Sequence, residues 1–224
     1  MNYFRYDTHV HTSEVSPCGV VEASDMVRLY KMAGYQGIII TDHYYNGFIE
    51  RFNCSWNEVV DHYLAGYRKA VSVGHQEELD ILLGMEMRFD GSPEDYLVYG
   101  FDEGFLCKNP YLNRLTIASF SELIAGKDIM IFQAHPYRMG LLPADPDLLD
   151  GVEAFNGNSR HNSNNDRAFA YGKNNGLFLF SGSDAHQIED VGRGGIGLTE
   201  RMQSSHELVK WIKSDKPVDL IYRA

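Results

Sequence analysis

Residues 37–43 read GIIITDH, a short apolar run of β-branched residues that ends in the polar triplet Thr41, Asp42 and His43. Similar apolar runs recur along the 224 residues, with helical patterns between them. They are ILLGM at 81–85, IMIFQ at 129–133, GVEAF at 151–155, LFLF at 177–180 and a run at 218–221. Strands that alternate with helices predict the α/β class, and runs without polar alternation are typical of parallel strands buried on both faces.

Capping signals mark the starts of two of the intervening helices. Ser55 and Glu58 have the spacing of a capping box ahead of a helix that we expect to end near residue 73, and Ser204 with Glu207 repeats the pattern. No internal repeat, low-complexity tract or linker is apparent. Since this length suits one compact unit, we expect residues 1–224 to form a single domain.

Composition excludes several classes of function. The 20 Lys and Arg against 31 Asp and Glu give a formal net charge of −11, which argues against binding of long duplex nucleic acid and favours small or short substrates. Apolar runs stay well below the ~18 residues needed to span a bilayer, so no membrane partner is expected. Three scattered cysteines indicate the reducing cytoplasm. The sequence predicts no oligomeric state.

Histidines and carboxylates gather at the carboxyl ends of the apolar runs. His9 and His11 are two residues apart in DTHVHT, so both imidazoles share one face of the first expected strand. The others follow later runs: His43, Glu86, His135, Asp184 and His186. A single histidine at a strand end is more often a hydrogen-bonded surface residue. Seven such residues at the rim where parallel barrels build their active sites instead predict a hydrolytic Zn, Mn or Fe site.

Competing chemistries lack a motif. The sequence has no GxxxxGK[ST] phosphate loop, no GxGxxG that follows a strand and no GxSxG elbow, which disfavours nucleotide-loop, dinucleotide and serine-hydrolase functions. The glycines of GRGGIG, residues 192–197, do not open a helix, and we expect them to form a flexible turn. Three other histidines have no carboxylate at ligand spacing and are expected to be solvated: His62, His75 and His206.

In chain order, HVH, TDH, GME, AHP and SDAH fall on successive strand ends, and with them the sequence resembles the PHP family, the polymerase and histidinol phosphatase metallohydrolases. The resemblance covers nearly the whole chain. It implies a distorted, TIM-like (β/α)7 barrel with the metal site at the carboxyl ends of the strands. It also implies a cluster of two or three divalent ions that cleaves phosphate esters.

The resemblance assigns roles residue by residue. His9 and His11 resemble the first-strand ligands, with Glu86 as a bridging carboxylate and Asp184 closing the first site. His135 resembles the ligand of a second site that shares Glu86.

His43 and His186 look like ligands of a third site, to which the family often adds a residue shortly after the HxH pair. Glu14 is the nearest candidate, and a solvated turn carboxylate is the alternative. Asp42 and Glu153 are expected to orient metal-bound imidazoles by accepting their other N–H. The resemblance therefore makes Asp184 and His186 candidate catalytic residues as well as metal ligands.

Two arginines match positions from which family phosphatases contact phosphate. They are Arg160, after GVEAFNGN, and Arg193, after SDAH; ordinary surface arginines are the alternative. His161 is a candidate proton donor to the leaving oxygen. We therefore expect a metal-activated water to hydrolyse a small phosphomonoester or short nucleotide. The alternatives are a non-catalytic metal-binding or regulatory domain and an exonuclease acting on short oligonucleotides.

One position departs from the family pattern. Many members place a histidine on the strand after the GME-like motif, where it helps to hold the second metal, and the matching position in YLVYG (96–100) is Leu97. An aliphatic side chain cannot ligate. The second site is therefore expected to bind its metal more weakly than the first, unless Tyr99, Asp95 or Glu94 compensates.

Overall fold

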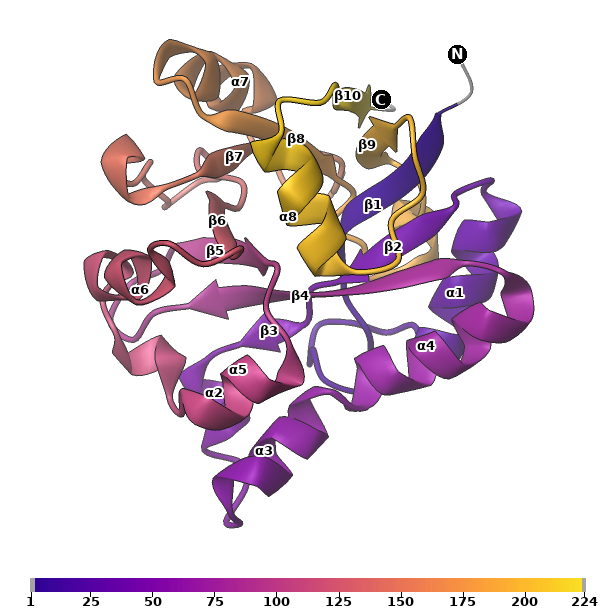
Figure 1. The fold of residues 1–224 in the computed structure, drawn as a ribbon, viewed down its shortest axis with the longest axis vertical. Helices are drawn as coiled ribbons and strands as arrows, with labels where there is room; N and C mark the ends of the chain where they lie inside the picture. The colour runs from indigo at the N-terminus through magenta and orange to yellow at the C-terminus, as the bar shows by residue number, and fades with distance from the viewer. Residues whose placement is uncertain (1–2, 223–224) are drawn as a thin grey trace.

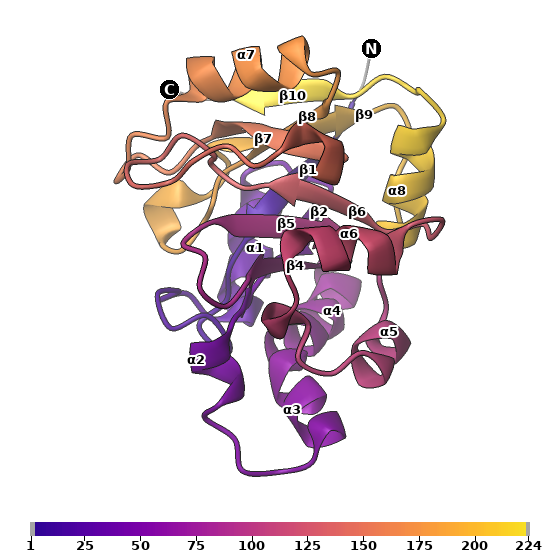
Figure 2. The same cartoon turned by 90° about the vertical axis from the view of Figure 1, so that its left-hand side faces the viewer.

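The computed structural model describes residues 3–222, in which a mixed sheet curls on itself (Figures 1 and 2). The strands are β1 (Phe4–Val10), β2 (Gly37–Ile40), β3 (His43–Tyr44), β4 (Asp80–Arg88), β5 (Asp95–Tyr99), β6 (Met130–Gln133), β7 (Gly151–Asn156), β8 (Phe178–Gly182), β9 (Gly194–Leu198) and β10 (Asp219–Tyr222). They follow the order β10-β9-β1-β2-β4-β5-β6-β7-β8, with β3 beside β4.

The sheet is nearly closed because β8 meets β1 at its carboxyl end. Val10 pairs with Ala185 in a parallel bridge, the His11 N–H donates to the Ala185 carbonyl at 3.0 Å, and Ala185 N donates to the His9 carbonyl at 3.2 Å. These bonds confirm the expected barrel. Strands from both ends of the chain share the one sheet.

The distortion of the barrel comes from its antiparallel members. β5 runs antiparallel to both β4 and β6, and β9 runs antiparallel to both β1 and β10. The start of β5, at Asp95, therefore lies at the same rim as the carboxyl ends of β4 and β6. This rim carries the expected site.

Helices cover the outside of the sheet (Figure 2). They are α1 (Ala23–Met32), α2 (Asn46–Ile49), α3 (Trp56–Tyr63), α4 (Ala65–Glu77), α5 (Glu103–Lys108), α6 (Ile117–Ile124), α7 (Asn165–Asn174) and α8 (Ser205–Lys213), with short 3-10 turns at Leu112–Arg114, Pro146–Leu148 and Ile188–Asp190. Both capping signals begin helices, since Ser55 N donates to Glu58 Oε2 and Glu207 N donates to Ser204 Oγ. The helix expected to run from Ser55 to about residue 73 is divided at Leu64 into α3 and α4.

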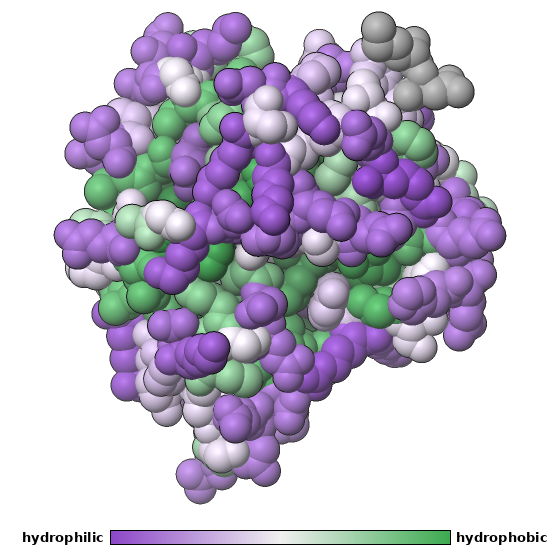
Figure 3. All heavy atoms as spheres, viewed as in Figure 1, coloured by the Kyte–Doolittle hydropathy of each residue, from purple (hydrophilic) through white to green (hydrophobic). Residues whose placement is uncertain are grey.

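The barrel interior is a dense aromatic and aliphatic core. Phe132 and Phe180 stack with ring centroids 4.3 Å apart, and Leu97 is fully buried beside them. Leu208 of α8 packs into the same cluster, and Gly100, just beyond β5, donates its N–H to Ser205 Oγ. Thus α8 closes the end of the barrel opposite the rim, and hydrophilic side chains cover its outer face (Figure 3).

The glycine-rich stretch at residues 192–197 differs from the structure that we expected for it. Gly194–Leu198 forms β9, between β10 and β1, so the expected flexible turn at residues 192–197 is wrong for most of that run. The reason is steric. A Cβ at Gly194 would collide with the carbonyl group of Gly182, and Gly195 has φ +142°, which L side chains rarely adopt. Glycine here permits close approach of two backbones.

Gly194→Ala should therefore destabilise the protein by about 1–3 kcal/mol, because the new methyl group meets backbone atoms that cannot move aside. Urea unfolding measures the loss. Gly104→Ala in α5 is the matched control, since its nearest contact would be a side-chain oxygen of Asp102 at 3.3 Å. A Gly194→Ala variant as stable as Gly104→Ala would contradict this packing.

Candidate metal centre

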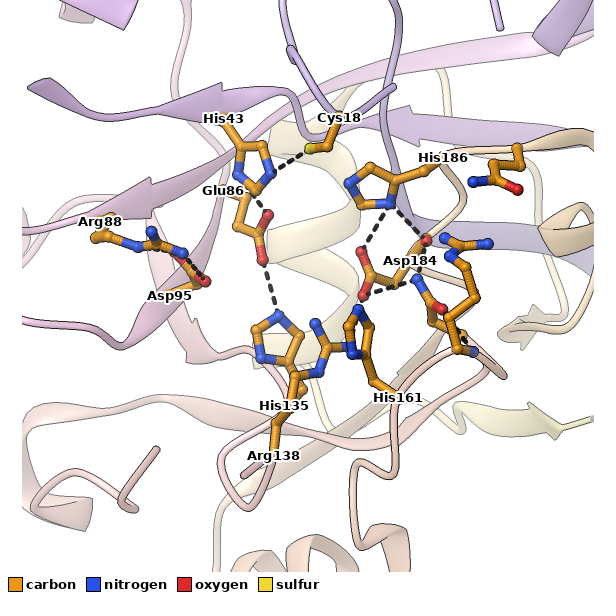
Figure 4. A pocket seen from close by; sticks show the side chains of 13 residues that line it. Cys18, His43, Glu86, Arg88, Asp95, His135, Arg138, His161, Asp184 and His186 are labelled. Atoms are coloured by element: carbon orange, nitrogen blue, oxygen red, sulfur yellow. Dashed lines mark hydrogen bonds and ion pairs between the residues drawn. The ribbon is translucent and has the colours of Figure 1, made fainter. Parts of the chain in front are cut away.

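The candidate ligands meet at the barrel rim around a cavity of about 310 Å³ (Figure 4). His9 lies in β1, His43 in β3 and Glu86 in β4, and Asp184 comes two residues after β8. His43 also follows the carboxyl end of β2, and the other three residues lie at or near the carboxyl ends of their strands, so the polar side chains project above the apolar interior. The cavity lining is Cys18, His43, Glu86, Arg88, Asp95, His135, Arg138, Asn158, Arg160, His161, Asp184, His186 and Gln187.

Four side chains converge tightly beneath this cavity. His9 Nε2 and His11 Nε2 each lie 3.3 Å from an oxygen of Glu86 and 3.5 Å from Asp184 Oδ1. Tetrahedral ligands with bonds of 2.0–2.1 Å have edges of ~3.4 Å. The observed separations match, so these atoms could surround one small divalent ion.

The hydrogen bonds of both histidines leave Nε2 free for a metal. His9 Nδ1 lies 2.8 Å from the carboxylate of Glu153, which can only accept, so Nδ1 carries the proton. Ser16 Oγ donates to Asp42 Oδ1 at 2.7 Å and therefore accepts from His11 Nδ1 at 3.0 Å. Within residues 3–222, Nε2 of either ring has no hydrogen-bond partner. Buried polar atoms are normally paired, so these two fit a metal ion.

Charge in the cluster favours a cation. Glu86 and Asp184 are buried, which alone would raise their pKa values, yet the neighbouring His9 holds the pKa of each well below its usual range. His9 itself is buried, but the carboxylates of Glu153 and Glu86 raise its pKa well above the usual value. The carboxylates are therefore ionised and require positive charge between them, which a divalent ion at His9 Nε2 would provide in place of a second ring proton.

A second set of candidate ligands shares Glu86. His135 Nε2 lies 3.1 Å from Glu86 Oε1, and His135 Nδ1 has no partner among the described residues. Leu97 pairs with Glu86 across β5 and β4 and is fully buried, so an apolar side chain stands next to this set. Asp95 and Glu86 offer oxygens within 4.8 Å of His43, but Asp95 also accepts two hydrogen bonds from Arg88.

A third set consists of His11, His43 and His186, whose ligand atoms lie within 4.8 Å of one another. Burial and the neighbouring His11 lower the pKa of His186 to about 3, so its ring is neutral. Glu14 lies outside this set. Its carboxylate is 2.8 Å from Lys69 Nζ and accepts from the Ala23 N–H at the start of α1.

Two of the candidate ligands have an unusual backbone. His135 has φ +31° and Asp184 has φ +52°, a region that residues other than glycine seldom occupy. Such conformations cost about 1–3 kcal/mol each and persist where surrounding bonds hold them. His135 N donates to Glu153 Oε2 at 3.0 Å, so the same glutamate fixes one ligand by its backbone and His9 by its ring.

The arginines predicted to contact phosphate are placed differently from each other. Arg160 lines the cavity and pairs with Asp190 at 2.6 Å. Arg193 lies outside the cavity lining, and its Nε donates to the Glu189 carbonyl. His161 lines the cavity, where burial and the charge of Arg138 lower its pKa.

Several site residues were missed from the sequence. Arg138 reaches Asp184 Oδ2 at 2.7 Å, and the buried Asp7 accepts from the N–H groups of His9 and Ser183. Arg138 follows directly on AHPY, so proximity to the AHP motif was an available signal. Ser16 and Cys18 carried no comparable signal, because a loop brings them back over the rim.

The comparisons with known proteins agree with this geometry. The sequence profile of the PHP domain matches residues 7–157, and a profile described as PHP-associated matches residues 162–217. The chain belongs to the PHP family. No curated protein matches the sequence.

Solved structures with the same fold include proteins of different kinds. PsfC from Pseudomonas syringae is 17% identical with a TM-score of 0.69, over 100% of this chain and 93% of that one. A two-domain protein from Bacteroides vulgatus, containing a predicted PHP-like metal-dependent phosphoesterase, is 14% identical with a TM-score of 0.66, over 99% of this chain and 65% of that one. The lesion-specific endonuclease PfuEndoQ from Pyrococcus furiosus is 15% identical with a TM-score of 0.67, over 98% and 58%. At these identities the likeness shows a shared fold.

From residue 3 to residue 222, none of the helices has the length and apolar character needed to cross a membrane.

Glu153→Gln should weaken binding of the first metal by about 10- to 100-fold, because the amide no longer provides the carboxylate that holds His9 Nδ1–H. Calorimetric titration with Zn²⁺ or Mn²⁺ measures the affinity. Glu14→Gln is the matched control and should bind metal like the wild type, since Glu14 faces Lys69. Equal losses in both variants would contradict the assigned roles.

Because Leu97 occupies a usual ligand position, we expect the first and second metal sites to differ in affinity. Titration of the metal-free protein, followed by elemental analysis, should show one tightly bound ion per chain and a weaker second ion at Glu86 and His135, because Leu97 provides no ligand there. Three ions bound equally tightly without substrate would show that this interpretation of Leu97 is wrong.

Proposed function

We propose that this protein is a metal-dependent phosphoesterase that hydrolyses a small phosphomonoester or short nucleotide with a metal-activated water. The observation that carries the proposal is the convergence of unpaired His9 and His11 Nε2 atoms with Glu86 and Asp184. Two or three divalent ions, of Zn, Mn or Fe, are the proposed cofactors. When bound, such ions lower the pKa of a water and neutralise phosphoryl charge.

The protein's own residues then position the reactants. Glu153 fixes the orientation and tautomer of His9, and Asp42 does the same for His11 through Ser16. Because these partners are themselves buried, the imidazoles cannot rotate freely. A preformed ligand set lowers the reorganisation needed when the phosphate arrives.

Cationic groups line one side of the cavity, where a phosphate would lie. Arg138 and Arg160 come from separate loops. His161 lies beside Arg138 in Figure 4, and the charges of both arginines act on its ring. Arginine forks match phosphate oxygens, which supports binding of the phosphoryl group between these loops and the metals. The lowered pKa of His161 keeps the ring neutral at pH 7, so its proposed transfer of a proton to the leaving oxygen requires it to gain one from solvent or substrate.

The cavity of about 310 Å³ favours a small substrate over a polymer. The net charge of −11 points the same way, because it repels long nucleic-acid backbones. The likeness to an endonuclease keeps a nuclease acting on short oligonucleotides as the second candidate. A non-catalytic metal-binding domain would have no use for arginines beside the ligands. We also propose a cytoplasmic location, based on the three scattered cysteines.

His11→Ala and Asp184→Ala should each lower kcat at least about 1000-fold by removing first-site ligands, without unfolding the protein. The assay uses p-nitrophenyl phosphate, sugar phosphates, histidinol phosphate, nucleoside bisphosphates and short oligonucleotides, each with Zn²⁺, Mn²⁺ or Fe²⁺. His62→Ala, on the exposed side of α3, is the matched control with wild-type activity. Near wild-type turnover by either ligand variant, with metal still bound, would contradict the proposal. An inactive wild type across the panel would favour the non-catalytic alternative.

A further inference from the structure

The third imidazole set lacks a protein ligand from the segment after the HxH pair. His43 and His186 face the cavity, while Glu14 is engaged by Lys69 and by the Ala23 N–H. Three imidazoles with no anionic partner of their own bind a divalent ion less well than a set that includes a negative ligand. The same loop offers another donor.

Cys18 lies where such a donor is needed. Its Sγ is 3.2 Å from His43 Nε2, and Cys18 lines the cavity together with His43 and His186. In Figure 4 its side chain lies between the two rings. His43 Nδ1 lies 2.8 Å from Glu86 Oε2, which can only accept, so the Nε2 lone pair faces the sulfur. Atoms bound to one tetrahedral Zn²⁺ at 2.1 Å for nitrogen and 2.3 Å for sulfur are ~3.6 Å apart. A shift of a few tenths of an ångström brings the thiol to that separation.

The loop that carries Cys18 is fixed to the strands that bear the histidines. On one side, Ser16 Oγ bonds His11 Nδ1 and accepts from the His43 N–H at 3.0 Å. On the other side, Val20 N donates to the His186 carbonyl at 2.9 Å. Gly19 packs against the Thr12 carbonyl, where a Cβ would lie only 3.0 Å away. The thiol is therefore held over the imidazoles by its neighbours on both sides.

A second observation points to a ligand at this place. His186 belongs to the same set and is 9% exposed. Its Nδ1 lies 2.9 Å from the Asp184 carbonyl, which can only accept, so Nδ1 carries the proton and the Nε2 lone pair, which has no partner among residues 3–222, is left for a cation. The set thus offers an unpaired nitrogen on a largely buried ring and a soft sulfur donor together.

We propose that Cys18 is a metal ligand of the third site and binds as a thiolate beside His43 and His186. The thiol proton leaves to solvent when the metal–sulfur bond forms. Sulfur ligation favours Zn²⁺, Fe²⁺ or Co²⁺ over Mn²⁺ and Mg²⁺, so this site would differ in metal preference from the carboxylate-rich first site. The inference rests on the proposed metal-dependent function and adds that the sites of the cluster differ in their metal preference.

Titration of the metal-free protein with Co²⁺ tests the ligand directly by absorption spectroscopy. The wild type should develop a thiolate-to-cobalt charge-transfer band in the near ultraviolet, in addition to the weaker visible bands of a histidine and carboxylate site. Cys18→Ser should lose the near-ultraviolet band and keep the visible bands. Cys54→Ser, which changes an exposed cysteine, is the matched control and should keep both.

The outcomes separate this inference from the proposed function. A near-ultraviolet band that survives in Cys18→Ser, or visible bands without that band in the wild type, would overturn Cys18 as a ligand and leave the first site intact. Absence of all cobalt bands would overturn the metal centre itself. The inference further expects Cys18→Ser to bind the last Zn²⁺ about tenfold or more weakly, with Mn²⁺ binding at the first site unchanged.

Discussion

A buried carboxylate that faces four imidazoles is the interaction on which the site depends. Glu86 is 1% exposed, and its oxygens lie between 2.8 and 3.3 Å from ring nitrogens of His9, His11, His43 and His135. An ionised carboxylate away from water is costly unless positive charge is close. The imidazoles, and the divalent ions that they could hold, provide that charge. Each of the four rings must therefore be held in place by the barrel.

The barrel meets this requirement through bonds beneath the rim. Glu153 of β7 joins His9 of β1 to the backbone of His135 after β6. Asp7 joins the backbone of His9 to that of Ser183, beside Asp184. These carboxylates bridge strands that are distant in sequence. The ligands therefore come together only when the sheet closes. The strained backbone at His135 and Asp184 persists because the same bonds hold it.

Much of this arrangement could be predicted from the sequence because it depends on where the strands end. The apolar runs give the sheet, and polar residues at their carboxyl ends must share a rim, which is why His9, His43 and Glu86 were expected together. What depends on loops could not be predicted. Cys18 and Ser16 return over the site through a path fixed by backbone bonds, and Glu14, closer to the HxH pair in sequence, instead faces Lys69. The strand within GRGGIG could not be predicted either, because glycine is typical both of turns and of strands whose backbones approach closely.

The central claim is that His9, His11, Glu86 and Asp184 surround one divalent ion. A crystal structure of the protein loaded with Mn²⁺ or Zn²⁺, with anomalous scattering measured at the metal edge, tests it most directly. The account predicts an anomalous peak about 2.0–2.2 Å from His9 Nε2, His11 Nε2 and oxygens of Glu86 and Asp184. A fully loaded protein with its strongest anomalous peak elsewhere, or with these two nitrogens bonded to other protein atoms, would contradict it.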